Sequence, residues 1–252
     1  MRRVHLFEFG DLPWWPAAIR DCVTDSLAFG VARMGLYAKA APLVAGLLAR
    51  AQTRDVVDLC SGGAGPWPRL REGLAGDVRV TLTDRQPNAA AILRIGALRD
   101  PRMRYYERPI DARSVPRELV GVRTIFTAFH HLDPASARGV RAAAAAAGAP
   151  IGVFEFTARS WTSILAAIVV PWTMFVTAPW IRPFRAARLL LTYVLPLAPL
   201  CSLWDGVVSS LRTYTVPELL ALGRSAAPEY RWEAGTLRGR GPAVTYLIGW
   251  PP

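Results

Sequence analysis

Two adjacent histidines, His130 and His131, are the residues of this sequence best suited to acid–base chemistry. Because the imidazole pKa lies near neutrality, a histidine can take a proton from a substrate group and release it again. Both follow the apolar run 124–129, where a strand is expected to end, and Glu155 closes the next strand-like run, 150–156. The spacing therefore predicts a catalytic edge made of these three residues. A structural reading stays open, in which a histidine caps the next helix and Glu155 only hydrogen-bonds the loop.

A glycine-rich segment, VVDLCSGGAGPW at residues 56–67, could hold a ligand through its backbone. A buried strand is expected to end near Asp58, and the glycines after it let the main chain approach a ligand closely. The helix that should begin near Pro66 offers free amide groups and the positive end of its dipole. A dinucleotide or an adenosyl cofactor could use this geometry, although a purely structural strand-to-helix turn has a similar pattern.

Acidic residues follow the next two strand-like runs. Asp84 ends the segment VTLTD, where a carboxylate can accept hydrogen bonds from both hydroxyls of a ribose, and Arg85 or Gln86 could flank an adenine. Asp111 comes just after a third strand-like run, in ERPIDAR. Because aspartate is common in turns, Asp111 is equally compatible with a plain loop role.

These segments, in this order, resemble the class I S-adenosylmethionine-dependent methyltransferases, and small-molecule O-methyltransferases most closely. The matching motifs are VVDLCSGGAG, VTLTD, the acid of ERPIDAR, FTAFHHLD and GVFEF, which span residues from about 50 to 157. The chain departs from the family at Cys60 and Ala64, where the family usually has glycines.

The resemblance implies S-adenosylmethionine as the cofactor and S-adenosylhomocysteine as the product. In the O-methyltransferases that this region resembles, a histidine takes the proton of a hydroxyl, and His130 matches that place best. The implied cofactor site consists of Asp58, Cys60, Ser61, Gly62, Gly63, Gly65, Asp84, Arg85, Asp111, Ala112 and Phe129.

Strand-like and helix-like runs alternate through the middle of the chain. Such alternation predicts an α/β fold with a doubly wound, mostly parallel Rossmann-like sheet and helices on both faces. Two further strand-like runs, 230–237 and 243–250, close the chain after a helix that Thr215 should cap. The expected divisions are an N-terminal helical cap at 1–50, a cofactor-binding core at 51–157, an apolar insert at 158–204, and a C-terminal helix with closing strands at 205–252.

The N-terminal cap carries apolar residues at helical spacing, which predicts a stripe that packs on the core. The stripe consists of Trp14, Trp15, Ile19, Val23, Leu27 and Val31. In the methyltransferases that the chain resembles, segments inserted after the fifth strand shape the acceptor site, so the insert and this cap are expected to cover a lipophilic substrate. The substrate-binding residues predicted on this basis are Trp14, Trp15, His130, Glu155 and Trp161.

The insert has two runs without charge, 160–181 and 189–204. Prolines interrupt both runs, and a spanning hairpin would leave Arg182, Arg185 and Arg188 on the side of the membrane opposite the catalytic part. A shallow, monotopic membrane contact is therefore favoured, with tryptophans at the interface and the arginines meeting anionic headgroups. Two alternatives remain open: the insert could cover a hydrophobic pocket, or it could form the interface of a homodimer.

The composition agrees with a folded, membrane-associating enzyme. Hydrophobic residues make up 52% of the 252 residues, charged residues make up 19%, and the net charge is +11. These values exclude disorder and favour anionic surfaces, but the scattered arginines argue against a nucleic-acid partner. The sequence contains no metal-ligand motif, phosphate-binding loop or serine elbow. The polar start of the chain and three dispersed cysteines indicate a cytoplasmic protein, peripheral at the inner face of the membrane.

The sequence thus predicts a methyltransferase that acts on a hydrophobic small molecule or lipid. Methylation of an oxygen is favoured, with His130 as the general base. The alternative is a membrane-peripheral protein that binds the adenosyl cofactor without transferring a methyl group.

Overall fold

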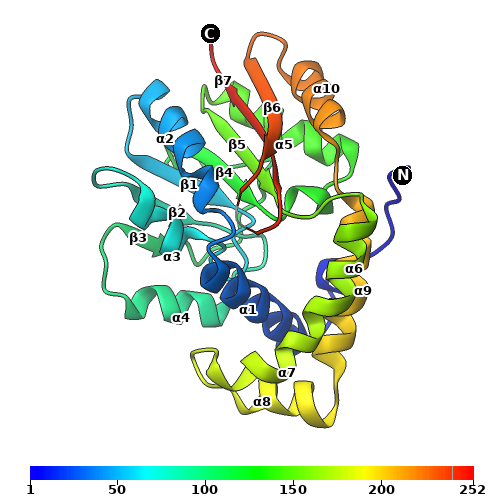
Figure 1. Ribbon diagram of the computed structural model, residues 1–252. Coiled ribbons are helices and arrows are strands. Elements are labelled where there is room, and N and C mark those ends of the chain that lie inside the picture. Colours follow the sequence, from blue (N-terminus) through cyan, green and yellow to red (C-terminus); the bar gives the residue numbers. More distant parts are fainter. Residues whose placement is uncertain (240) are drawn as a thin grey trace.

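The computed structural model describes residues 1–239 and 241–252, and its centre is a seven-stranded sheet (Figure 1). The strand order is β3-β2-β1-β4-β5-β7-β6. The strands are β1 (Asp55–Leu59), β2 (Arg79–Leu82), β3 (Met103–Tyr105), β4 (Val122–Phe126), β5 (Ile151–Glu155), β6 (Arg231–Leu237) and β7 (Val244–Trp250).

Strands β1 to β5 are parallel, and β7 is antiparallel both to β5 and to β6. The order reverses between β1 and β4, because the chain first builds outward to β3 and then returns to the other side of β1. In open α/β sheets, ligands bind at such a reversal, outside the carboxyl ends of the strands. The predicted doubly wound, mostly parallel sheet is confirmed.

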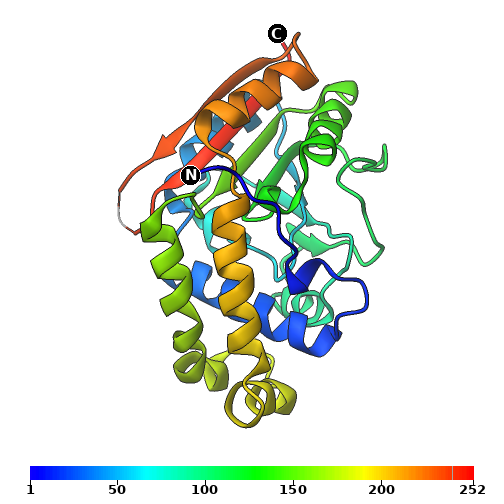
Figure 2. The ribbon, with the colours of Figure 1, turned by 90° about the vertical axis from the view of Figure 1, so that its right-hand side faces the viewer.

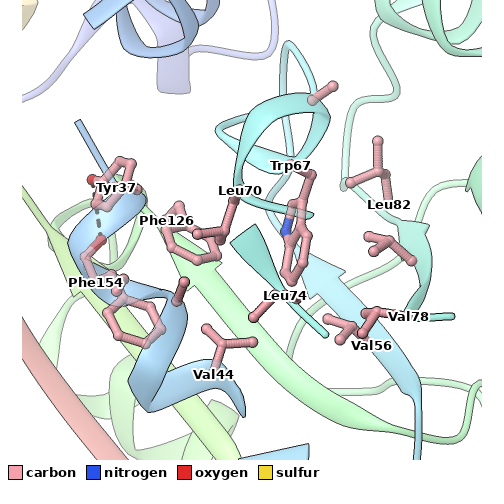
Figure 3. Packing of buried hydrophobic residues seen from close by; sticks show 14 of the residues in the cluster. Tyr37, Val44, Val56, Trp67, Leu70, Leu74, Val78, Leu82, Phe126 and Phe154 are labelled. Carbon is pink, nitrogen blue, oxygen red and sulfur yellow. Dashed lines mark hydrogen bonds between the residues drawn. The ribbon is translucent and has the colours of Figure 1, made fainter. Parts of the chain in front are cut away.

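Helices cover both faces of the sheet, because alternate residues of its strands point to opposite sides. Val56 belongs to a core cluster with α2, α3 and α4, whereas Val57 belongs to a second cluster with α5 and α10. Figure 3 shows the first cluster, in which Trp67 and Phe126 lie edge to face. These helices are α2 (Ala41–Arg50), α3 (Trp67–Leu70), α4 (Ala89–Ala97), α5 (Pro134–Ala146) and α10 (Val216–Ala226).

Local sequence explains where three of these helices begin. The side chains of Asn88 and Asp133 accept hydrogen bonds from the first backbone amides of α4 and α5. Thr215 and Glu218 form a capping box at the start of α10, which confirms Thr215 as the expected cap. Short 3-10 helices lie at Phe9–Asp11, Ala38–Ala40, Arg71–Gly73, Phe129–His131, Val170–Thr173 and Ala178–Trp180, and a π-helix lies at Leu190–Val194.

The N-terminal helix α1 (Ala17–Met34) buries only part of the predicted stripe. Its buried residues are Ile19, Cys22, Asp25 and Val31. Trp14 and Leu27 are exposed, so the prediction was wrong for these two. The reason is that the insert packs on α1 as well, and it buries Asp25 through an ion pair that apolar spacing cannot reveal.

The insert forms a helical lobe that extends away from the sheet (Figures 1 and 2). Its helices are α6 (Trp161–Val169), α7 (Met174–Thr177), α8 (Ala186–Leu189) and α9 (Leu197–Arg212). Helix α6 packs along α9, and α9 also contacts α1. Helix α9 continues through residue 204, where the sequence analysis placed the end of the insert.

The arginines between the two apolar runs lie in different environments. Arg188 is buried and pairs with Asp25 at 2.8 Å, and Arg185 pairs with Asp21 at 3.0 Å. The expectation that all three arginines meet lipid headgroups was therefore wrong for Arg188, because its charge is neutralised inside the protein. Arg182 is exposed.

One helical stretch of the described chain, Trp161–Trp180, is long and apolar enough to cross a membrane, and 17% of its apolar window is buried. Two further pairs of helices reach the required length and hydropathy only if each bent pair is counted as one span. These pairs are Ala17–Met34 with Ala38–Arg50, and Ala186–Val194 with Leu197–Arg212.

Candidate active site

The loop after β1 turns through four residues with positive φ: Cys60 (57°), Gly62 (45°), Ala64 (77°) and Gly65 (50°). Cys60 and Ala64 stand at the places where the sequence departs from glycine, and both adopt the left-handed conformation that glycine would adopt more easily. Such a conformation costs a residue with a side chain roughly 1–2 kcal/mol. The turn is therefore kept without the glycines, at a cost in local strain.

Gly63 is required by the packing of α1 on this loop. A Cβ at Gly63 would lie 2.9 Å from the Cβ of Ala28 and 3.0 Å from the backbone oxygen of Thr24. These atoms belong to rigid parts of a helix, so neither can move without moving α1. The glycine-rich segment thus joins the sheet to the N-terminal helix, in addition to any contact with a ligand.

We expect Gly63→Ala to lower the free energy of unfolding by about 1–3 kcal/mol, because overpacking forces the helix away from the loop. Gly96→Ala is the matched control. Gly96 lies in α4 and a Cβ there would meet nothing within 4 Å, so we expect a gain of about 0.5–1 kcal/mol from helix propensity. Urea denaturation of both variants measures the two values. Equal stability of the two variants would contradict the tight contact with α1.

Asp58 lies inside the protein, beneath the loop. Its carboxylate accepts hydrogen bonds from the hydroxyls of Ser61 and Thr124, both at 2.6 Å. Burial raises the pKa of Asp58 to about 6, and these hydrogen bonds limit the rise. Asp58 therefore fixes the first turn of the loop and ties it to β4.

Asp84, at the carboxyl end of β2, closes on the same loop. Its carboxylate accepts hydrogen bonds from the backbone amides of Gly62 at 2.8 Å and Gln86 at 2.7 Å. Burial raises the pKa of Asp84, and the hydrogen bonds from the amides of Gln86 and Gly62 limit the rise, with smaller effects from the positive charges of His131 and Arg20. One guanidinium nitrogen of Arg20, Nη1, is buried without a hydrogen-bond partner. No sequence motif indicated Arg20, because it lies on α1, far along the chain from every motif.

The other predicted cofactor residues are not all gathered around the loop. Arg85 is exposed, and the carboxylate of Asp111 pairs with Arg113 at 2.6 Å. Ala112 and Phe129 are buried in the second core cluster, where the ring of Phe129 packs near Tyr214. At this edge of the sheet, Phe129 offers its backbone amide, which donates to Glu155 at 2.7 Å.

His130 and Glu155 form a buried pair between the ends of β4 and β5. Nδ1 of His130 lies 2.9 Å from Oε2 of Glu155, and the backbone amides of Phe129 and His130 donate to Oε1. Burial would raise the pKa of Glu155, but the attraction of His130 outweighs it and lowers the pKa. A carboxylate at Nδ1 fixes the proton there, which leaves the lone pair of Nε2 to accept another proton.

His131 has a different environment. Nδ1 lies 2.8 Å from Oδ1 of Asp11 and 3.4 Å from Oε2 of Glu8. Burial would lower the pKa of His131, but Glu8 and Asp11 outweigh it and raise the pKa to about 9. His131 is therefore protonated at neutral pH, so His130 is the better candidate for a general base.

The N-terminal segment lies across both histidines, which the sequence analysis did not foresee. Asp205 of α9 accepts hydrogen bonds from the amides of Phe9 and Gly10, at 2.8 and 3.2 Å. These bonds position Glu8, which is buried, 3.9 Å from Nε2 of His130 and 3.2 Å from Nη1 of Arg212. No sequence pattern indicated Glu8, because its contacts join residues far apart in the chain.

The predicted substrate tryptophans lie at the surface. Trp14 is 70% exposed and Trp161, at the first turn of α6, is 72% exposed, so neither lines an enclosed pocket. Trp15 is half-buried, with its ring 4.5 Å from that of Phe9. A hollow of about 540 Å³ lies at the opposite ends of β1 and β2 and includes none of the predicted site residues.

Several solved structures are similar to this chain. One is NcsB1, an O-methyltransferase of neocarzinostatin biosynthesis, solved in complex with S-adenosylmethionine and 2-hydroxy-5-methyl naphthoic acid. It is 15% identical to this chain, with a TM-score of 0.58, and the match covers 93% of this chain and 58% of NcsB1. An O-methyltransferase family protein from Burkholderia thailandensis is 20% identical, with a TM-score of 0.50 over 88% of this chain and 58% of its own. Human N-acetylserotonin methyltransferase in complex with S-adenosylmethionine is 13% identical, with a TM-score of 0.51 over 90% and 55%.

The chain thus spans less than two thirds of each of these three proteins. No protein-family model and no curated protein matches the chain in sequence.

Proposed function

Because the chain has the fold of the class I, Rossmann-like methyltransferases, we propose that it transfers the methyl group of S-adenosylmethionine to a hydroxyl of a hydrophobic small molecule or lipid. One observation carries the proposal. The glycine loop with Asp84 and the His130–Glu155 pair lie at the carboxyl edge of the sheet, on the two sides of the reversal between β1 and β4. The proposed cofactor site and the proposed base therefore lie next to each other, at the edge where sheets of this kind bind ligands.

The residues of the loop fit an adenosyl cofactor. A Cβ at Gly65 would meet nothing within 4 Å, so the backbone there is open to a ligand. Asp84 uses each carboxylate oxygen for one backbone amide and keeps a lone pair on each for the ribose hydroxyls. Arg20, whose charge acts on Asp84 and whose Nη1 is buried without a hydrogen-bond partner, is suited to bind a carboxylate of the cofactor.

The bound cofactor supplies an electrophilic methyl group on a sulfonium. The protein has to hold the acceptor oxygen in line with that methyl group and remove its proton. In this proposal Nε2 of His130 takes the hydroxyl proton, and the Glu155 carboxylate stabilises the imidazolium that forms. Glu155 is then a positioning residue, since its contacts are with the imidazole and the backbone rather than with the acceptor.

The lipophilic acceptor is inferred from the surface of the insert. Trp161, Trp172, Val176, Trp180 and Val194 are each at least 66% exposed. Large contiguous apolar patches are rare on monomeric soluble proteins and mark interaction sites with membranes or other proteins. The lobe extends beyond the sheet, and it carries the exposed Arg182 between its two apolar stretches in a chain of net charge +11. These features support an anionic lipid surface as the partner, reached at the cytoplasmic face of a membrane.

We expect the protein to bind anionic vesicles. The double variant Trp172→Ser/Trp180→Ser should bind them at least about tenfold more weakly, because burial of each indole in the interface contributes roughly 2–3 kcal/mol. Leu93→Ser is the matched control, since Leu93 is 66% exposed on α4 of the sheet domain. Vesicle sedimentation measures the binding. A wild-type protein that stays in the supernatant as a dimer would show that another copy of the chain covers this face.

The transferase proposal is tested by incubating the pure protein with S-adenosylmethionine and a lipid extract, and measuring S-adenosylhomocysteine. Release that depends on the extract supports transfer. Cofactor binding without release under these conditions would favour the alternative of a binding protein.

A further inference from the structure

Two buried acceptor atoms face one another beneath the N-terminal segment. Nε2 of His130 has no hydrogen-bond partner, and the side chain is 2% exposed. Oε1 of Glu8 lies 3.9 Å from it and also makes no hydrogen bond, although it is ion-paired with Arg212. With the proton of His130 on Nδ1, both atoms offer only lone pairs. A buried nitrogen without a hydrogen-bond partner, such as Nε2 of His130, costs free energy, so a hydrogen-bond donor or a cation between the two atoms would stabilise the protein.

From this arrangement we propose that Glu8, His130 and His131 form a binding site for a divalent transition-metal ion, with zinc as the best match. One ligand atom from each residue lies within 4.8 Å of the other two. Two imidazoles and one carboxylate are a donor set that zinc prefers. With bonds of about 2.0–2.1 Å, a tetrahedral zinc ion places neighbouring ligands roughly 3.3 Å apart. Oε2 of Glu8 lies 3.4 Å from Nδ1 of His131, and Oε1 lies 3.9 Å from Nε2 of His130, so each imidazole has one carboxylate oxygen near this distance.

The groups around the three ligands also fit a metal site. Glu155 holds Nδ1 of His130, which is the carboxylate–histidine arrangement that orients metal-binding imidazoles. Asp11 lies beside His131, and Arg212 pairs with both Asp11 and Glu8. The cluster thus holds three carboxylates and one guanidinium, and a dication would neutralise the negative charge that remains when His131 releases its proton to water on binding the metal.

Occupation of this site has a consequence that rests on the proposed function. A metal ion on Nε2 of His130 uses the lone pair that would otherwise accept the hydroxyl proton. The same ion binds the N-terminal segment, through Glu8, to the strand ends. Zinc would therefore inhibit methyl transfer and protect the segment that contains Glu8 from proteolysis.

Calorimetric titration of the metal-free, folded protein with zinc chloride tests the site without any activity measurement. We expect binding of one equivalent, and at least about tenfold weaker binding in Glu8→Gln and in His131→Gln. His5→Gln is the matched control, because His5 is the remaining histidine of the sequence and lies on the same segment outside the cluster. Its affinity should equal that of the wild type. Thermal melting shows whether each variant is folded.

Cobalt(II) gives a second readout, because its visible absorption reports whether imidazole and carboxylate ligands surround it. No zinc binding by the wild type, or wild-type affinity in both folded ligand variants, would overturn the site. If zinc binds as expected but the protein transfers no methyl group with any extract, the proposed function fails and the metal site stands. If the protein is active and saturating zinc leaves its turnover unchanged, the site does not include His130 and the proposal is wrong.

Discussion

The His130→Ala variant is expected to bind the cofactor as tightly as the wild type and to turn over at least about a hundredfold more slowly. The reason is that His130 is held by Glu155 with Nε2 free to accept a proton, and a lost general base usually costs this much. Neighbouring His131 cannot replace it, because Asp11 and Glu8 keep it protonated at neutral pH. Single-turnover kinetics together with cofactor titration separate the two effects.

Glu155→Gln is the companion variant. An amide at this position has a single acceptor oxygen, so it can accept from Nδ1 of His130 only with its NH2 group turned toward the backbone amides of Phe129 and His130, and it lacks the charge that stabilises the imidazolium. We therefore expect turnover to fall by less than in His130→Ala, with KM little changed. Full turnover in His130→Ala would remove the base from the mechanism.

The Asp84→Asn variant is expected to bind the cofactor about ten- to a hundredfold more weakly. A hydrogen bond to a charged group contributes about 1.5–3 kcal/mol, and the carboxylate is proposed to receive both ribose hydroxyls. The substitution also weakens the bond that holds the amide of Gly62, so part of the loss reflects a looser loop. Equilibrium titration with S-adenosylhomocysteine measures the affinity.

Asp77→Asn is the matched control for this substitution. Asp77 precedes the opposite end of β2, and its side chain is 73% exposed beside Arg102. It should keep wild-type affinity. If Asp84→Asn, folded by thermal melting, also keeps it, Asp84 is not a ribose ligand.

Short-range patterns in the sequence were enough to predict the sheet and one half of the site. Strands β1, β2, β4 and β5 each coincide with a short apolar run of the sequence, and parallel strands bring their carboxyl ends to one edge of the sheet. His130 and Glu155 could therefore be placed together from their positions at the ends of successive strands, and the structure brings them to 2.9 Å. The loop and Asp84 were placed near each other by the same reasoning.

The remaining features depend on contacts between distant parts of the chain. Glu8 and Arg20 reach the site because α9 and the sheet hold the N-terminal segment and α1 in place, and neither residue stands in a motif. The face that α1 buries could not be predicted, since it includes Asp25, whose partner Arg188 is in the insert. The positive φ of Cys60 and Ala64 was equally hidden, because these residue types rarely adopt it.

The most direct test of this account is a calorimetric titration of the folded wild-type protein with S-adenosylhomocysteine. We expect saturable binding of one molecule per chain, because the loop around Gly62 and the carboxylate of Asp84 are proposed to form the cofactor site. A protein that is folded by its melting curve and takes up neither this nucleoside nor S-adenosylmethionine would contradict it.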